Sequence, residues 1–212
     1  MKKGLFITLE GGDGAGKSTQ MDFIEKYFGE LGYECVRTRE PGGTVIGEKL
    51  RDILLDANND EMSAETEMMI YAASRAQHVK EFIKPALDNG KVVICDRYVD
   101  SSVAYQGYGR NLGDAVWNVN KYAVDSVMPD ITFWMDIDPK SGRERIGNRE
   151  DSSLDRLERE KLDFHYRVYE GYRCICEKEP DRVKRIDATK SIEEIRDEIF
   201  RTLDELCSRV HR

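Results

Sequence analysis

Short apolar runs alternate with longer amphipathic stretches along the chain. The apolar runs are rich in β-branched and aromatic residues and have the length of strands, and they lie at 5–9 (LFITL), 34–38 (ECVRT), 92–95 (VVIC), 131–137 (ITFWMDI) and 183–187 (VKRID). Several are apolar at consecutive positions, a pattern typical of strands buried on both faces. The runs therefore predict a sheet that is covered on both sides.

Helical periodicity fills the intervals between these runs. The stretch 17–31 has apolar residues at helical spacing, at Met21, Phe23, Ile24, Tyr27, Phe28 and Leu31. Further helical stretches are expected at about 44–57, 63–88, 114–128, 139–149, 155–178 and 191–209. Strands that alternate with helices are joined by right-handed crossovers into a parallel sheet. We therefore predict a three-layer α/β fold, in which helices cover both faces of a five-stranded parallel sheet.

One segment departs from this pattern. Residues 143–161 (RERIGNREDSSLDRLEREK), here called the lid segment, are dense in charges of both signs and poor in apolar side chains. This composition predicts a mobile, solvated excursion outside the core. No internal repeat or linker interrupts the rest of the chain, so we expect residues 1–212 to form a single domain.

Composition and charge narrow the function classes. Of the 212 residues, 40% are hydrophobic and 35% charged, as in ordinary globular proteins. The formal net charge of −8 argues against binding to a nucleic-acid polymer, which requires a basic surface. Neither a signal-peptide layout nor an apolar run near the roughly 20 residues of a membrane helix is found. These features favour a cytoplasmic protein that does not bind membranes.

The five cysteines are odd in number and irregularly spaced, which favours reduced thiols. Cys174 and Cys176 could suggest a metal site, but no second Cys or His pair lies at a ligand spacing. We interpret them as thiols on a helix.

A phosphate-binding motif follows the first predicted strand. Residues 11–18 (GGDGAGKS) match G-x-x-x-x-G-K-[ST], and the position between a strand and a helix is the context that supports such a loop. Its glycines let backbone N–H groups converge on phosphate oxygens, while Lys17 adds a charge and Ser18 can hold Mg²⁺. The alternative is a flexible glycine-rich turn. We predict that a nucleoside triphosphate, ATP, binds at Gly11, Gly12, Asp13, Gly14, Ala15, Gly16, Lys17, Ser18 and Thr19.

A second charged pair closes the third predicted strand, at Asp96 and Arg97. Ligands of parallel sheets bind at the carboxyl ends of the strands. If the third strand lies beside the first, Asp96 can complete a Mg²⁺ shell and Arg97 can bind a second phosphate. A surface ion pair is the alternative. The guanine-binding motif N-K-x-D is absent, because Asn120-Lys121 precedes Tyr122-Ala123, and no D-x-x-G switch follows the third strand.

Five strings together resemble the thymidylate kinase family over nearly the whole chain. They are EGGDGAGKST (10–19), REPGGT (39–44), YAASR (71–75), DRYVDSSVAYQG (96–107) and the basic lid at 143–159. The resemblance implies transfer of the γ-phosphate of ATP to thymidine monophosphate (dTMP), with Mg²⁺, in dTTP biosynthesis. It further implies direct in-line transfer, a homodimer, and the strand order 2-3-1-4-5.

The resemblance assigns acceptor-site roles to individual residues. Asp13 corresponds to the carboxylate near the 3′-hydroxyl of the acceptor, and Arg97 to the arginine on its phosphate. Tyr105 corresponds to the tyrosine that crowds the 2′ position of the sugar and so favours deoxyribose. Arg51 and Glu40 match positions that line the same cleft, although the composition of 40–44 also indicates a simple turn.

Four more residues match the family's base pocket. Tyr71 corresponds to an aromatic residue that stacks on the base, and Arg75 to an arginine that contacts a thymine carbonyl. Ser102 and Gln106 match polar positions near the N3 edge. On periodicity alone Tyr71 reads as a core residue, and the neighbouring Ser101 or Asp100 is expected to cap a helix.

Some thymidylate kinases carry an arginine inside the phosphate loop, where this chain has Gly14. The transferring phosphoryl group still requires positive charge. Resemblance to the branch with a lid arginine implies that Arg149 is the catalytic cation. Arg145 and Arg143 are the alternative candidates, here called the reserve arginines. The alternative is that these arginines only pair with neighbouring acidic residues on a solvated helix.

Several questions stay open at the level of sequence. The adenine site is expected near the lid arginines and residues 187–190 (DATK). Helices at 44–57, 63–88 and 114–128 could bury an apolar face in a dimer. Two other functions remain possible: a kinase for another nucleoside monophosphate or a deoxynucleoside, and a non-enzymatic nucleotide-responsive module whose lid recruits a partner.

Overall fold

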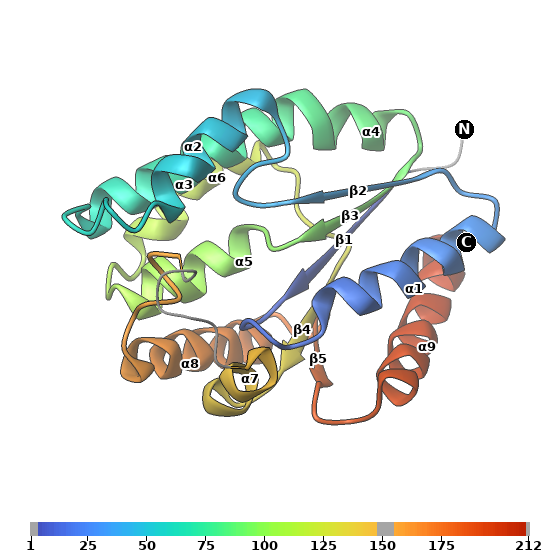
Figure 1. Cartoon of the computed structure of the whole chain (residues 1–212). Coiled ribbons are helices and arrows are strands. Elements are labelled where there is room, and N and C mark those ends of the chain that lie inside the picture. Colours follow the sequence, from blue (N-terminus) through green and yellow to red (C-terminus); the bar gives the residue numbers. More distant parts are fainter. Residues whose placement is uncertain (1–3, 148–154, 211–212) are drawn as a thin grey trace.

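A computed structural model of the chain describes residues 4–147 and 155–210 (Figure 1). Five strands form one sheet: β1 (Leu5–Glu10), β2 (Cys35–Arg39), β3 (Val92–Asp96), β4 (Ile131–Asp136) and β5 (Val183–Asp187). All neighbouring pairs are parallel, and the order is β2-β3-β1-β4-β5. The predicted fold class and strand order are therefore confirmed.

Helices cover both faces of this sheet, as the apolar runs predict (Figure 1). They are α1 (Lys17–Glu30), α2 (Val45–Leu55), α3 (Ala64–His78), α4 (Lys84–Asp88), α5 (Val99–Ser102), α6 (Ala115–Val124), α7 (Pro139–Ile146), α8 (Leu162–Lys178) and α9 (Ile192–Val210), with π-helical turns η1 (Val79–Ile83) and η2 (Val103–Gly109). None of the helices in the described ranges is both long and apolar enough to cross a membrane.

The apolar residues of strand β1 contribute to the hydrophobic clusters on both faces of the sheet. The side chains of β1 alternate between faces, so that Leu5, Ile7 and Leu9 pack with residues of α1 and α9. Phe6 points the other way and packs with residues of η1, α5 and α6. A strand buried in this manner has to be apolar at successive positions, which is the pattern seen in the sequence.

The structure corrects several predicted helix bounds. The segment after β3, where the sequence predicts only a helix start near Asp100 or Ser101 and no bounds, folds into α5 and η2. The helix expected over 63–88 is divided by the π-helical turn η1. The helix expected over 114–128 ends at Val124, because Asp125 adopts a left-handed conformation with φ 46°.

The lid segment is described only at its two ends, 143–147 and 155–161. The expectation of a solvated excursion is wrong for the second end, where Arg156 and Leu157 are buried. The Arg156 guanidinium pairs with buried Glu67 and donates to the Leu54 carbonyl, so this charge is compensated inside the protein. Residues 155–161 form turns, since Asp155 Oδ1 accepts from two backbone amides, and α8 begins only at Leu162.

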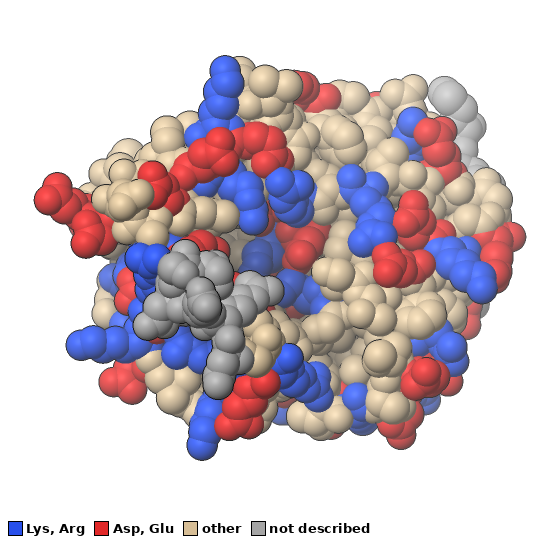
Figure 2. Space-filling model, viewed as in Figure 1, with Lys and Arg blue, Asp and Glu red and all other residues tan. Residues whose placement is uncertain are grey.

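The sheet brings three chain segments to one edge. Leu9 pairs with Asp96, and Asp96 also pairs with Arg39 of β2. The carboxyl ends of β1, β3 and β2 therefore lie side by side, each followed by a loop. In Figure 2 acidic and basic side chains are interspersed over this face, and Lys and Arg atoms lie inside a hollow near its middle.

Candidate active site

The phosphate loop occupies the turn between β1 and α1. Gly14 has a left-handed φ of 76°, and a Cβ there would lie 2.2 Å from the Gly142 carbonyl oxygen. An arginine at this position is therefore incompatible with the present packing of α7 on the loop. At the N-terminus of α1, no described side chain caps the free amides, which leaves them available to an anion.

Lys17 is buried inside this loop. Its ammonium donates to the Gly11 carbonyl at 3.2 Å and to the Gly12 carbonyl at 3.1 Å. Burial lowers the pKa of Lys17, as does the positive charge of Arg97, while Asp96 and other carboxylates oppose this shift. The ammonium is thus held in place before any phosphate arrives.

Asp96 and Ser18 have the chemistry expected of a magnesium site. Asp96 Oδ1 lies 4.0 Å from the Lys17 ammonium. It is buried, and within residues 4–147 and 155–210 it has no hydrogen-bond partner. A buried carboxylate oxygen without a partner is costly unless a cation compensates it. Ser18 is exposed in the first turn of α1, so both oxygens fit a divalent ion bound with the phosphates.

Arg97 reaches the same loop from the end of β3. Its backbone has a left-handed φ of 69°, rare for a residue with a side chain, and its amide donates to the Leu9 carbonyl at 2.9 Å. The guanidinium donates to Asp13 Oδ1 at 2.8 Å and lies 5.2 Å from the centre of the Tyr105 ring. The predicted approach of Asp96 and Arg97 to Lys17 is thus seen in the structure.

A cavity of about 200 Å³ opens beside Arg97. Its lining includes every residue that the resemblance assigns to the acceptor site: Asp13, Glu40, Arg51, Tyr71, Arg75, Arg97, Ser102, Tyr105 and Gln106. We call it the acceptor pocket. Tyr71 both lines the pocket and packs in an apolar cluster with Leu54, so its two sequence interpretations are compatible.

The Arg75 guanidinium is fully buried at one wall of the pocket. It donates to Glu40 at 2.8 Å, to Ser102 Oγ at 2.9 Å and to the Tyr98 carbonyl at 3.0 Å, and it also bonds Asn120. Glu40 is therefore a buried partner of Arg75 rather than part of a simple turn.

Sequence reasoning missed two buried partners of this wall. In the sequence, Asn120 belongs only to an incomplete N-K-x-D motif, and His78 belongs to no motif. His78 Nδ1 lies 2.9 Å from the second oxygen of Glu40, and its Nε2 lies 2.7 Å from Thr38 Oγ1. Polar side chains on the buried face of a helix were the available signal, since such groups require partners.

A third missed residue is Glu67, one turn before Tyr71 on α3. It is fully buried and accepts hydrogen bonds from Gln106 and Arg110, and it pairs with Arg156. Burial alone raises the pKa of a carboxylate, but the bonds from Arg110 and Gln106 and the charge of Arg156 lower the pKa of Glu67 below its usual value. Glu67 is thus ionised at neutral pH.

Ser101 and Asp100 do not cap α5, contrary to the sequence expectation. The helix follows Tyr98 without a side-chain cap. Asp100 instead pairs with Arg182 at 2.7 Å, and the Ser101 hydroxyl donates to buried Glu10 at 2.5 Å. Tertiary partners thus replaced the local cap.

Glu10, the last residue of β1, has a pKa raised to about 7. Burial is the main cause and the charge of Asp100 adds to it, while the bond from Ser101 and the charge of Arg97 oppose it. The folded protein therefore binds a proton between about pH 4.5 and 7 that the unfolded chain has released. This contribution to stability is complete below the unfolded value of 4.5 and is lost as the pH rises to 7.

The variant Glu10→Gln has no carboxyl group at this position, so its stability should not show this decrease with pH. We expect the Tm of the variant minus the Tm of the original protein to be about 4–8 °C larger at pH 8 than at pH 5, which corresponds to about 2 kcal/mol. Differential scanning calorimetry at several pH values measures the difference. Parallel pH profiles of the two proteins would show that Glu10 does not titrate in this range.

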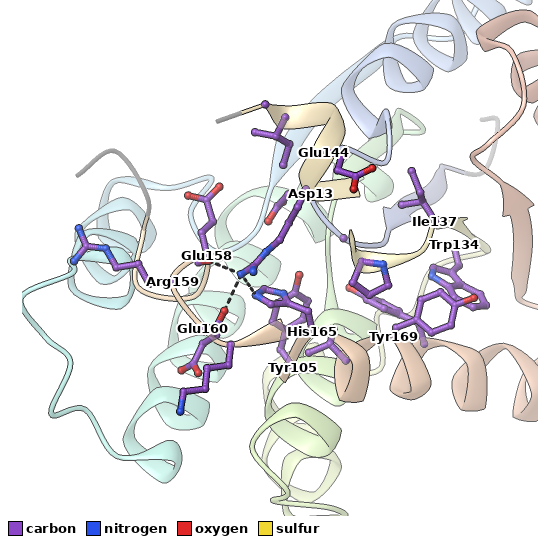
Figure 3. A pocket seen from close by; sticks show the side chains of 18 residues that line it. Asp13, Tyr105, Trp134, Ile137, Glu144, Glu158, Arg159, Glu160, His165 and Tyr169 are labelled. Atoms are coloured by element: carbon purple, nitrogen blue, oxygen red, sulfur yellow. Dashed lines mark hydrogen bonds between the residues drawn. The ribbon is translucent and has the colours of Figure 1, made fainter. Parts of the chain in front are cut away.

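A larger cavity of about 890 Å³ lies between α7 and α8 and shares Asp13, Tyr105 and Glu158 with the acceptor pocket. In Figure 3, Trp134, Ile137 and Tyr169 form one side, and residues 158–160 of the lid segment face them. The two cavities therefore meet beside Asp13 of the phosphate loop.

The two reserve arginines of the lid both have protein partners. Arg143 donates to the carbonyls of Glu158 and Glu160 at 2.9 and 2.7 Å, and its Nη2 lies 3.0 Å from His165 Nε2 (dashed in Figure 3). Arg145 donates to the Ala188 carbonyl at 2.8 Å, which brings it to the expected adenine loop. Arg149 lies outside the described residues.

The parallel sheet with strand order 2-3-1-4-5, the phosphate loop and the adjoining acceptor pocket define a phosphate-loop kinase of the nucleoside monophosphate kinase class. The sequence model of the thymidylate kinase family matches residues 9–199. The chain belongs to this family, as the resemblance predicted.

Individual relatives support the same family over the full fold. A thymidylate kinase of Clostridium novyi is 48% identical over 94% of this chain and 98% of its own length. Another, of Halothermothrix orenii, is 50% identical over 93% of this chain and 95% of its own. The crystal structure of the Ehrlichia chaffeensis thymidylate kinase superposes with a TM-score of 0.78 at 34% identity, covering 95% of this chain and 99% of that one.

Proposed function

We propose that this protein transfers the γ-phosphate of ATP to dTMP, in the cytoplasm, as a step of dTTP biosynthesis. The observation that carries the proposal is the contact between Arg97 and Asp13 at 2.8 Å. It joins the acceptor pocket to the phosphate loop, so that a donor and an acceptor phosphate bound in the two sites meet end to end. Family membership supports the same activity.

The transfer is direct and in line, without a covalent enzyme intermediate. Lys17 and the loop amides hold the donor phosphates, and Arg97 aligns the acceptor phosphate for attack. Magnesium, when held by Ser18 and Asp96, neutralises charge between the phosphates. An acceptor phosphate is already an anion, so the reaction requires no strong base. We assign to Asp13 the role of accepting a hydrogen bond from the 3′-hydroxyl of the acceptor.

The far end of the acceptor pocket suits a thymine ring. We place the base against Tyr71, with a carbonyl toward Arg75 and the N3 edge toward Ser102 and Gln106. Tyr105 packs under Arg97, and we place it against the 2′ position of the sugar, where it favours deoxyribose. Arg51 donates to the Pro41 carbonyl at 2.9 Å and so supports the loop that bears Glu40.

We further propose that the lid segment 143–161 closes over the phosphates and excludes water. Its described ends support this, since Arg143 and Glu158 line the larger cavity and Asp155 and Glu158 line the acceptor pocket. Arg145 and residues 187–190 are proposed to bind the adenine of ATP.

Purified protein supplied with ATP, Mg²⁺ and a panel of acceptors tests this function. We expect dTMP to be converted to the diphosphate far faster than other nucleoside monophosphates or deoxynucleosides. Equal turnover of uridylate or guanylate would contradict the thymidylate assignment. Nucleotide binding without any diphosphate product would instead support the non-enzymatic module.

We also propose that the protein is a homodimer that packs through α2, α3 and α6. These three helices lie side by side (Figure 1), and each of them carries exposed apolar side chains. They are Val45, Ile46, Ile53, Met69, Trp117 and Tyr122. Such residues mark an interaction surface when they are contiguous.

Light scattering of the purified protein checks the dimer. We expect a mass of two chains, and a shift toward one chain in the variant Met69→Glu, because Met69 is 58% exposed and its replacement leaves the monomer core intact. A variant mass identical to that of the original dimer would remove this face of α3 from the interface.

A further inference from the structure

The Gln106 side-chain amide can adopt only one orientation in this structure. Its Nε2 lies 2.8 Å from Oε1 of Glu67. Because Glu67 is ionised, its oxygens only accept hydrogen bonds, so the group of Gln106 that faces it has to be the NH₂. An amide without such a partner can rotate by 180° at little cost. If the Gln106 amide rotated, its carbonyl oxygen would face the buried Glu67 carboxylate, and two acceptors would repel each other.

Glu67 is itself fixed by two cations. Arg110 Nη2 lies 3.0 Å and Arg156 Nη1 2.7 Å from its Oε2. Arg156 is anchored through the Leu54 carbonyl, and the Arg110 guanidinium lies 4.7 Å from the centre of the Phe164 ring. The carboxylate therefore cannot turn away from Gln106 without breaking several buried interactions.

The carbonyl oxygen of Gln106 is left for a ligand. Gln106 lines the acceptor pocket together with Tyr71, Arg75 and Ser102. Within the part of the chain that the structure describes, no group donates a hydrogen bond to Gln106 Oε1. The pocket wall thus presents a hydrogen-bond acceptor at Gln106 beside the cationic donor group of Arg75.

Pyrimidine bases differ at the edge that this wall would meet. Thymine has an N–H donor at N3 next to a carbonyl acceptor at C4. Cytosine has an acceptor at N3 next to an amino donor at C4. Its N3 would therefore face the Gln106 carbonyl, acceptor against acceptor, and its amino group would face the Arg75 guanidinium, donor against donor. Mismatched polar groups in a buried site are left unpaired, which is how such sites reject analogues by large factors.

We propose that Glu67 is a positioning residue that holds the Gln106 carbonyl toward the acceptor base and so selects pyrimidines with an N3–H group over cytosine-type bases. Glu67 touches neither substrate nor phosphate and acts only through Gln106. This inference rests on the proposed placement of the base between Tyr71 and Gln106.

The test compares dTMP with 5-methyl-deoxycytidine monophosphate, which differ only at this edge. The readout is the ratio of their kcat/KM values. In Glu67→Gln the neutral partner can face Gln106 with either its oxygen or its nitrogen, so Gln106 is free to turn. We expect the ratio to fall at least about tenfold, with KM for dTMP rising and KM for ATP unchanged.

A double variant separates orientation from general damage. In Glu67→Gln with Gln106→Glu, the residue at 106 is a carboxylate and presents an acceptor in either orientation. We expect the selectivity lost in the single variant to return. Equal losses of activity toward both acceptors in Glu67→Gln, with the ratio unchanged, would overturn the proposal, because a merely structural ion pair predicts that result.

Three further variants complete the test. Glu160→Gln removes the other carboxylate on Arg110 without touching Gln106, and its ratio should match that of the original protein. If Glu67→Gln does not fold, Glu67→Asp keeps the charge but withdraws it from Gln106, and the same fall is expected. If Gln106→Leu has the same dTMP kinetics as the original protein, the placement of the base is contradicted. If Gln106→Leu changes these kinetics but Glu67→Gln does not change the selectivity ratio, only the role of Glu67 is contradicted.

Discussion

Replacing Arg97 with lysine is expected to lower kcat for dTMP phosphorylation by at least about a hundredfold. A lysine keeps the positive charge that Asp13 requires but loses the planar fork that aligns two oxygens of the acceptor phosphate. The left-handed backbone and the stacking on Tyr105 aim this fork at the phosphate loop. Steady-state kinetics with dTMP and ATP varied separately measure the loss.

The dissociation constant of ATP should change little in Arg97→Lys, because the proposed mechanism assigns the donor phosphates to Lys17 and the loop amides. A matched control is Arg173→Lys on α8, whose guanidinium is half exposed and pairs with Glu170 and Glu177 of the same helix. Its kcat should stay within about twofold of the original. Full activity of Arg97→Lys would show that charge alone, and not alignment, is what this position supplies.

The second large effect is expected for Arg149→Ala, which should lower kcat by two or more orders of magnitude while the nucleotide dissociation constants hardly change. An arginine at the transferring phosphoryl group contributes about 10³–10⁵ in rate. The phosphate loop cannot supply one, since a Cβ on Gly14 would lie 2.2 Å from the Gly142 carbonyl. We therefore expect the cation to come from another segment, and the lid segment carries five arginines, at positions 143, 145, 149, 156 and 159.

Comparison with the reserve arginines makes this test specific. Arg143 and Arg145 already donate to backbone carbonyls of the protein. Their alanine variants should thus affect lid position or nucleotide binding, seen in KM, more than kcat. An unchanged kcat in Arg149→Ala would remove Arg149 from the mechanism, and a selective loss in Arg145→Ala would transfer the role to that residue.

The donor site could be predicted from local sequence, and much of the acceptor site could not. Residues 10–19 are contiguous, so their spacing alone specifies the loop, the helix start and the position of Lys17. The acceptor residues are spread from Asp13 to Gln106, and their spacing has no meaning without the sheet order. The end of the third strand pointed to Arg97, but only resemblance to a family assigned the other eight, and all nine line the acceptor pocket.

The buried partners of those residues escaped prediction for a physical reason. Glu67, His78 and Asn120 lie on helices where a polar residue ordinarily faces water, and a position on the apolar face of a helix does not reveal which distant group is its partner. Ser101 and Asp100 show the converse error, because a local capping pattern was overruled by Glu10 and Arg182.

The amino-acid sequence by itself determined the alternation of strands and helices and the chemistry of the phosphate loop, because both depend on backbone geometry and side-chain spacing within a few turns. The tertiary structure decided which carboxylates hold which cations. Glu40 with Arg75, and Glu67 with Gln106, Arg110 and Arg156, are separated by 35 to 89 positions in the chain. Packing on one face of the sheet brings them together and removes the water that would otherwise weaken their interactions.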